Sequence, residues 1–192
     1  MNKINWGIIG LGKVALKFAE AFKNIKNSRL IAVSSKNTNK LENFKKKFQI
    51  NEKYCFNKYE DLLENKDVDI VYIALPNSFH MEWIIKCIKN NKNILVEKPA
   101  TINYAEIKNI KSHLDNKNLF FSEGFMYLHH PQILKVISLI KENIIGKPIS
   151  MNSSYGINLL TKKFFFVFEK KKKIDKKNRL FNKELGGGAI LD

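Results

Sequence analysis

Cysteine is scarce in this chain of 192 residues, which contains only Cys55 and Cys87. Both lie in segments patterned as ordinary secondary structure, and the N-terminus lacks the pattern of a secretory signal. We therefore expect reduced thiols and a cytoplasmic protein. Long apolar runs are missing too, because the longest aromatic cluster, at residues 164–168, is far shorter than the ~20 residues of a membrane helix. We expect no membrane association.

Acidic residues are also few: 18 Asp and Glu stand against 34 Lys and Arg, which gives a formal net charge of +16. Such a balance can indicate a nucleic-acid partner. Most lysines, however, are scattered over expected helix surfaces, and the only block lies at residues 170–173, 176 and 177. Because charge blocks are usually solvated loops, we expect no nucleic-acid partner, only a general attraction for anionic cofactors and substrates.

The stretch from Ile4 to Ala15 has the pattern of a dinucleotide fingerprint. An apolar run over Ile4–Ile9 predicts a buried strand, which breaks at Gly10 and Gly12 before helical spacing begins. Gly10 would make the tight turn, Gly12 would let a pyrophosphate approach the backbone, and Ala15 would let the helix pack closely on the strand.

The helix that follows would offer its first amides, those of Lys13 and Val14 included, to an anionic phosphate. Its apolar residues, Val14 among them, fall mostly on one face over residues 13–26. The glycines alone leave open a tight strand-to-helix turn that binds nothing.

The second expected strand, residues 30–33, ends in Ser34, Ser35 and Lys36. An NAD-specific site commonly places an acidic residue here, next to the ribose 2′-hydroxyl, and none is present. The Ser35 hydroxyl and the Lys36 ammonium could instead hold a 2′-phosphate, so NADP is favoured over NAD. The alternative is that Lys36 is an ordinary surface lysine.

Strands and helices are expected to alternate through the first two thirds of the chain. Further strands are predicted at 54–56, 70–74, 93–96 and 119–121, and helices at 41–48, 59–64, 79–90 and from 103 onward, where Asn103 and Glu106 suggest a capping box. This alternation predicts an α/β fold with a doubly wound parallel sheet of the Rossmann type.

The pattern changes after this point. A helix at 132–141, a strand at 149–155 and a strand at 164–168 within a lysine-rich loop are expected there. We therefore predict a dinucleotide-binding domain at residues 1–123, followed at 124–192 by the start of an α+β domain for substrate binding and oligomerisation.

The chain resembles the glucose–fructose oxidoreductase/inositol dehydrogenase (Gfo/Idh/MocA) family, particularly members related to dihydrodiol dehydrogenases. The matching blocks are residues 7–12 with Ala15, 71–80, 97–99, 123–127 continuing to 130–132, and 179–180 followed by 185–192. Each block is a weak signal alone, but together they occur in the family's order along the whole chain.

The resemblance implies hydride transfer between a nicotinamide cofactor and a sugar, cyclitol or vicinal diol. Lys98 would hold the substrate hydroxyl and take part in moving its proton, and the bond to the following proline can be cis. Glu97 would meet the cofactor ribose. The other side of the cofactor would be lined by Leu75, Pro76, Asn77 and His80. Without the family, Glu97 and Lys98 would be read as a surface ion pair, and no metal site is predicted.

Family members are considerably longer, so the chain is expected to be truncated within the second domain. In the family, the counterpart of Asp192 helps bind substrate, and a His or Tyr proton donor follows within about one helical turn. A complete second domain would imply a homo-oligomer. Two functions therefore stay open: an NAD(P)-dependent oxidoreductase represented by its N-terminal portion, or a truncated remnant that binds nucleotide without turnover.

Overall fold

In the computed structural model, residues 3–154, 161–164, 168–171 and 182 are described. A six-stranded sheet with the order β3-β2-β1-β4-β5-β6 forms the centre, and all its strand pairs are parallel. Its strands are β1 (Ile4–Ile9), β2 (Ser28–Ser34), β3 (Cys55–Phe56), β4 (Ile70–Ile73), β5 (Asn93–Val96) and β6 (Phe121–Glu123). This is the strand order of a doubly wound dinucleotide-binding sheet, which confirms the predicted fold class.

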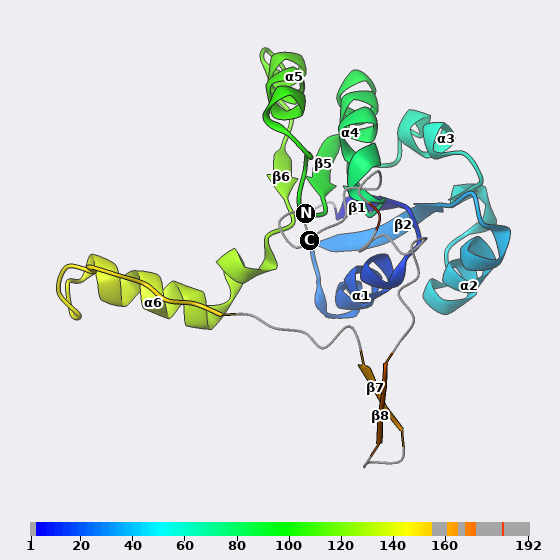
Figure 1. Cartoon of the computed structure of the whole chain (residues 1–192). Coiled ribbons are helices and arrows are strands. Elements are labelled where there is room, and N and C mark those ends of the chain that lie inside the picture. The colour runs from blue at the N-terminus through cyan, green and yellow to red at the C-terminus, as the bar shows by residue number, and fades with distance from the viewer. Residues whose placement is uncertain (1–2, 155–160, 165–167, 172–181, 183–192) are drawn as a thin grey trace.

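Helices cover both faces of the sheet (Figure 1). One face carries α1 (Lys13–Ala21) and α2 (Thr38–Phe48), and the other carries α3 (Tyr59–Glu64), α4 (His80–Lys89) and α5 (Tyr104–Leu114). Helix α6 (Pro131–Lys141) follows the sheet along the chain and extends away from it (Figure 1). None of the described helices is long and apolar enough to cross a membrane.

Both faces of the central strands are buried, which explains their continuous apolar sequences. On one face, Ile8 and Tyr72 pack with residues of α1 and α2. On the other face, Ile9, Val71 and Ile73 pack with residues of α3, α4 and α5. Because successive strand side chains point to opposite faces, each of these strands supplies both cores at once.

The ends of two helices confirm local predictions. The side chain of Asn103 accepts a hydrogen bond from the Glu106 backbone N–H at 3.0 Å and so caps α5. The Glu106 carboxylate returns to the N–H of Ile102 at 3.1 Å, one residue earlier than a standard capping box would place it. Asn37 caps α2 in the same way, through the Lys40 N–H at 3.0 Å.

Three details of the sequence prediction are wrong. Strand β6 lies two residues later than expected, because pairing of Phe121 with Ile94 of β5 sets its register. Val14, expected on the apolar face of the first helix, is 45% exposed, whereas its neighbour Ala15 is fully buried. Residues 149–154 form no strand, and Ile149 is 99% exposed there. The strand expected at 164–168 lies mostly outside the described residues; on either side of that gap, β7 (Thr161–Phe164) and β8 (Phe168–Lys171) pair antiparallel.

Buried Lys92 stabilises the end of the sheet opposite the glycine turn. Its ammonium donates hydrogen bonds to the carbonyl oxygens of Asn65 at 2.6 Å and Val68 at 2.7 Å. Burial lowers the pKa of Lys92, and the carboxylate of Asp69 partly opposes that shift. The lysine therefore supplies donors to carbonyl oxygens just before β4 begins.

Replacing Lys92 by Met should lower the free energy of unfolding by about 2 kcal/mol, because two carbonyls lose their donor. Urea denaturation measures this, with exposed Lys89→Met as the control. In the folded state the pKa of Lys92 is below the ordinary value of 10.5. At pH values between the folded-state pKa and 10.5, the unfolded chain therefore binds more protons than the folded chain. The stability advantage of wild type over the Met variant should therefore increase as pH rises through that window. If wild type and Lys92→Met had the same free energy of unfolding at every pH, this would contradict the stabilising role of Lys92.

Candidate functional site

The strands end in register along one edge of the sheet. Their paired terminal residues are Phe56, Ser34, Ile9, Ile73, Val96 and Glu123. The predicted site residues of the described chain follow these strand ends directly. Because β1 and β4 are neighbours whose connections run to opposite faces, this edge contains the switch point at which doubly wound sheets bind ligands.

The turn after β1 requires glycine at its first position. Gly10 has φ +87°, and a Cβ built there would lie 2.7 Å from the carbonyl oxygen of Ala74. Its N–H donates to the carbonyl oxygen of Ser34 at 3.1 Å. The first glycine therefore brings the turns after β1 and β4 into direct contact.

Gly12 has a different environment. A Cβ there would meet nothing within 4 Å, so the space beside it is open. It is the N-cap residue of α1, and no side chain caps the helix within the described structure. The first turn, which includes Lys13 and Val14, contains no acidic residue. Uncapped amides beside open space fit a phosphate group.

Close packing of α1 on the sheet depends on Ala15. Its side chain is fully buried against the β1 and β4 side of the core. A larger residue here would push α1, and its first amides, away from the strand ends.

In the turn after β2, the two residues expected to hold a 2′-phosphate differ in their exposure to solvent. Ser35 is 5% exposed, and its hydroxyl oxygen accepts the Asn37 N–H at 3.1 Å. Lys36 is exposed, and its ammonium lies 5.8 Å from the centre of the Tyr59 ring. Lys36 is therefore the more accessible of the pair.

After β4, the chain passes through Leu75 and Pro76 to buried Asn77 and buried His80. The His80 ring is fully buried, with Nε2 2.8 Å from the carbonyl oxygen of Leu75 and Nδ1 2.7 Å from that of Pro99. His80 thus links the turns after β4 and β5, and its role beside the cofactor stays a prediction.

The turn after β5 holds Glu97 and Lys98, and the Lys98–Pro99 peptide bond is cis, as the resemblance allowed. The Tyr72 hydroxyl donates a hydrogen bond to Oε1 of Glu97. Burial, and then this contact, raises the pKa of Tyr72, so the hydroxyl stays protonated and acts as a donor. Tyr72 was missed at the sequence level because an aromatic residue within an apolar strand indicates only core packing.

Asp192 and the block at 179–192 lie outside the described residues apart from Asn182. The role expected for Asp192 and the domain limits at 123 and 124 stay predictions. The described residues contain no cluster of side chains that could hold a metal ion.

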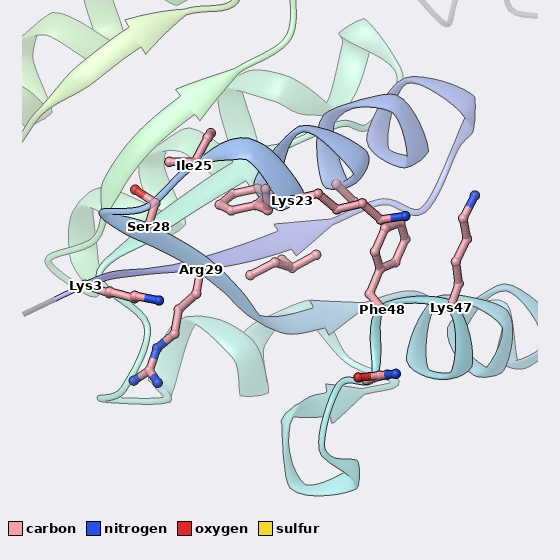
Figure 2. A pocket seen from close by; sticks show the side chains of 11 residues that line it. Lys3, Lys23, Ile25, Ser28, Arg29, Lys47 and Phe48 are labelled. Carbon is pink, nitrogen blue, oxygen red and sulfur yellow. The ribbon is translucent and has the colours of Figure 1, made fainter.

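A cavity of about 560 Å³ lies at the other edge of the sheet, where β1 and β2 begin. Its lining includes Lys3, Lys23, Arg29 and Lys47 around apolar residues. Figure 2 shows Lys3 and Arg29 on one side of it and Lys47 with Phe48 on the other. Among the described residues, none of those predicted for the site lines this cavity, so it is distinct from the candidate site at the strand ends.

The strand order, the glycine turn and the uncapped helix define a dinucleotide-binding Rossmann domain. The model of an oxidoreductase family with an NAD-binding Rossmann fold, Gfo/Idh/MocA, matches residues 4–125. The chain belongs to this family, and its Rossmann domain is of the NAD(P)-binding kind.

Relatives that the chain matches are named as dehydrogenases and ketoreductases. The chain is 28% identical over 189 residues to a trans-1,2-dihydrobenzene-1,2-diol dehydrogenase of Xenopus tropicalis, covering 97% of this chain and 52% of that protein. It is 30% identical over 192 residues to dTDP-3,4-didehydro-2,6-dideoxy-alpha-D-glucose 3-reductase of Actinomadura kijaniata, covering 100% of this chain and 53% of the relative. The chain thus spans about half the length of these curated relatives.

Solved structures show the same fold. A 3-ketoreductase from Actinomadura kijaniata in complex with NADP superposes with a TM-score of 0.68 at 32% identity, covering 76% of this chain and 46% of that one. Apo scyllo-inositol dehydrogenase from Lactobacillus casei gives a TM-score of 0.71 at 26% identity, with 76% and 43% covered.

The two glycines of the turn should respond to substitution in opposite ways. Gly10→Ala should destabilise the fold by about 1–3 kcal/mol, because φ is positive and the new Cβ meets the Ala74 carbonyl. Gly12→Asp should keep or raise the melting temperature, since Asp is a good N-cap, yet abolish NADPH binding by occupying the helix amides. Thermal unfolding and NADPH fluorescence titration measure both effects.

Gly12→Ser is the matched control, because it caps the helix without adding charge. An Asp variant that binds NADPH as tightly as wild type would show that α1 does not receive the phosphates.

Proposed function

We propose that this chain is the cofactor-binding part of an NADP-dependent oxidoreductase that transfers a hydride between the nicotinamide and a sugar, cyclitol or vicinal diol. The observation that carries the proposal is the register of the strand ends. Because Ile9, Ile73 and Val96 pair in one row, the glycine turn, the Leu75–Asn77 segment and Lys98 begin at the same edge of the sheet.

Different residues along this edge would bind different parts of the cofactor. The amides of Lys13 and Val14 would bind the pyrophosphate beside Gly12, where the open space supports close approach. Lys36 would bind the 2′-phosphate, with the Ser35 hydroxyl buried behind it. Glu97, held through one oxygen by Tyr72, would offer its other oxygen to a ribose hydroxyl. The bound cofactor supplies the hydride acceptor or donor.

Lys98 would hold the substrate next to the nicotinamide and so lie against both the substrate and the cofactor. Its side chain is half-buried and starts two residues beyond the end of β5. The ammonium Nζ would donate a hydrogen bond to the reacting oxygen and exchange a proton with it as the carbon changes between alcohol and carbonyl. Asp192 would bind a second substrate hydroxyl, as the family resemblance implies.

The proposed substrate class is supported by what the named relatives share. A dihydrobenzene diol, a dideoxy-glucose derivative and scyllo-inositol each carry oxygen atoms on ring carbons. A cation at Lys98 next to a second polar group suits such a substrate, because two neighbouring oxygens can be held at once. The particular polyol would be selected by residues outside the described part of the chain.

We also expect the protein to form an oligomer and to reside in the cytoplasm. Helix α6 exposes Leu134 by 53% and Ile140 by 42%, which supports contact with further protein, and a homo-oligomer is the form that the resemblance implies. Cys55 and Cys87 are unpaired, in keeping with the reducing cytoplasm expected for the protein.

Lys98→Met should leave NADPH affinity nearly unchanged and abolish substrate-dependent NADP reduction, because it removes the ammonium proposed to exchange a proton with the substrate oxygen. Fluorescence titration measures the first effect, and absorbance at the NADPH band across a panel of sugars, inositols and diols measures the second. Lys89→Met, on an exposed part of α4, is the control. Wild-type binding without reduction of NADP by any of these substrates would favour the nucleotide-binding remnant.

Lys36→Ala should weaken NADP binding about tenfold and leave NAD binding almost unchanged, because a charged hydrogen bond to the 2′-phosphate is lost. Competition against NADPH fluorescence measures both affinities, and exposed Lys46→Ala in α2 controls for the general loss of positive charge. Equal weakening of NAD and NADP would remove Lys36 from the phosphate site.

A further inference from the structure

The segment of residues 97–100, which carries Lys98, is held by side chains from three other elements. Tyr72 of β4 contacts Glu97, and His80 of α4 contacts the carbonyl oxygen of Pro99 at 2.7 Å. The third contact comes from β6, where Oε1 of Glu123 accepts the backbone N–H of Ala100 at 2.6 Å. The turn is therefore fixed before, at and after the proline.

Glu123 owes its place to the sheet register. It is the last residue of β6 and pairs with Val96, the last residue of β5. The next N–H, that of Gly124, donates to the carbonyl oxygen of Val96 at 2.7 Å. A Cβ at Gly124 would lie 3.2 Å from that oxygen and 3.6 Å from Oε1 of Glu97, so glycine keeps β6 close to the turn. Glu123 thus reaches the turn from a fixed neighbouring strand.

The hydrogen bond between Glu123 and the N–H of Ala100 lies in a buried environment. Ala100 is 5% exposed, so its N–H has little access to water, and an unpaired buried N–H is costly. A carboxylate acceptor gives a short, charge-assisted hydrogen bond, as the distance of 2.6 Å indicates. Loss of that acceptor should therefore release the turn rather than be absorbed by solvent.

We propose that Glu123 is a positioning residue whose carboxylate holds the turn so that the Lys98 ammonium is placed at the substrate oxygen. This inference rests on the proposed role of Lys98. It assigns to Glu123 an action through the backbone of Ala100, without contact between Glu123 and the substrate or the cofactor.

Three substitutions of Glu123 test the length of its side chain and its charge separately. Glu123→Gln keeps the length and an acceptor oxygen but loses the charge. Glu123→Asp keeps the charge but is shorter by one methylene, and Glu123→Ala loses both. If the Ala variant does not fold, the Gln and Asp pair still tests whether reach to Ala100 matters.

Two measurements on the cofactor-free chain report the position of the turn. Amide hydrogen exchange followed by NMR should show the Ala100 N–H exchanging about tenfold faster in the Asp and Ala variants, with the core amide of Ile84 unchanged. Limited acetylation with acetic anhydride, read by peptide mass spectrometry, should modify Lys98 about threefold faster in the same variants because the loosened turn is more open. Lys89 in the same digest is the internal reference.

The Gln variant should stay much closer to wild type than to the Ala variant in both measurements, because it keeps the reach and an acceptor oxygen and loses only the charge assistance. Unchanged Ala100 exchange in the folded Asp variant, or a Gln variant as loose as the Ala variant, would overturn the inference. NADPH should also protect Lys98 of wild type from acetylation. If it does not, the proposed function fails, and that failure is visible separately because the exchange of Ala100 is measured without nucleotide.

Discussion

The register of the parallel sheet is the constraint on which the rest of this structure depends. Ile9, Ile73 and Val96 are paired, so the chain leaves three neighbouring strands at one level. In a parallel sheet every strand points the same way, and residues far apart in sequence are thereby collected along one edge. A shift of one residue between β4 and β5 would exchange the two faces and move the turn of Lys98. Burial on both faces strongly disfavours such a shift.

The turns at this edge are rigid for reasons that differ from one to the next. Gly10 is confined by its positive φ and by Ala74, and the turn after β2 is closed by the Ser35 hydroxyl. His80 and Tyr72 connect the turns after β4 and β5 to the protein interior. Binding groups are thus fixed before any ligand arrives, which lowers the entropic cost of ordering them.

Much of the fold follows from sequence patterns, because buried parallel strands are short apolar runs and Gly10 and Gly12 mark a turn of known geometry. The site is less visible in the sequence. Tyr72 looks like a core residue, and only the three-dimensional register brings its hydroxyl to Glu97. The expected place of His80 beside the cofactor stays a prediction, but the contacts of its buried ring with carbonyl oxygens nineteen and five residues away could not be derived from the sequence. Contacts between a side chain and a distant backbone leave no periodic signal in a sequence.

We propose that the turns after β1, β4 and β5 form one nucleotide site. The most direct measurement is an NADPH titration of the ¹⁵N-labelled chain followed by amide chemical shifts. We predict that the amides of Gly12, Leu75 and Lys98 shift together along one saturation curve, while that of Arg29 at the opposite edge stays in place. Shifts confined to the basic cavity around Arg29, or an absence of saturable shifts at the three turns, would contradict the claim.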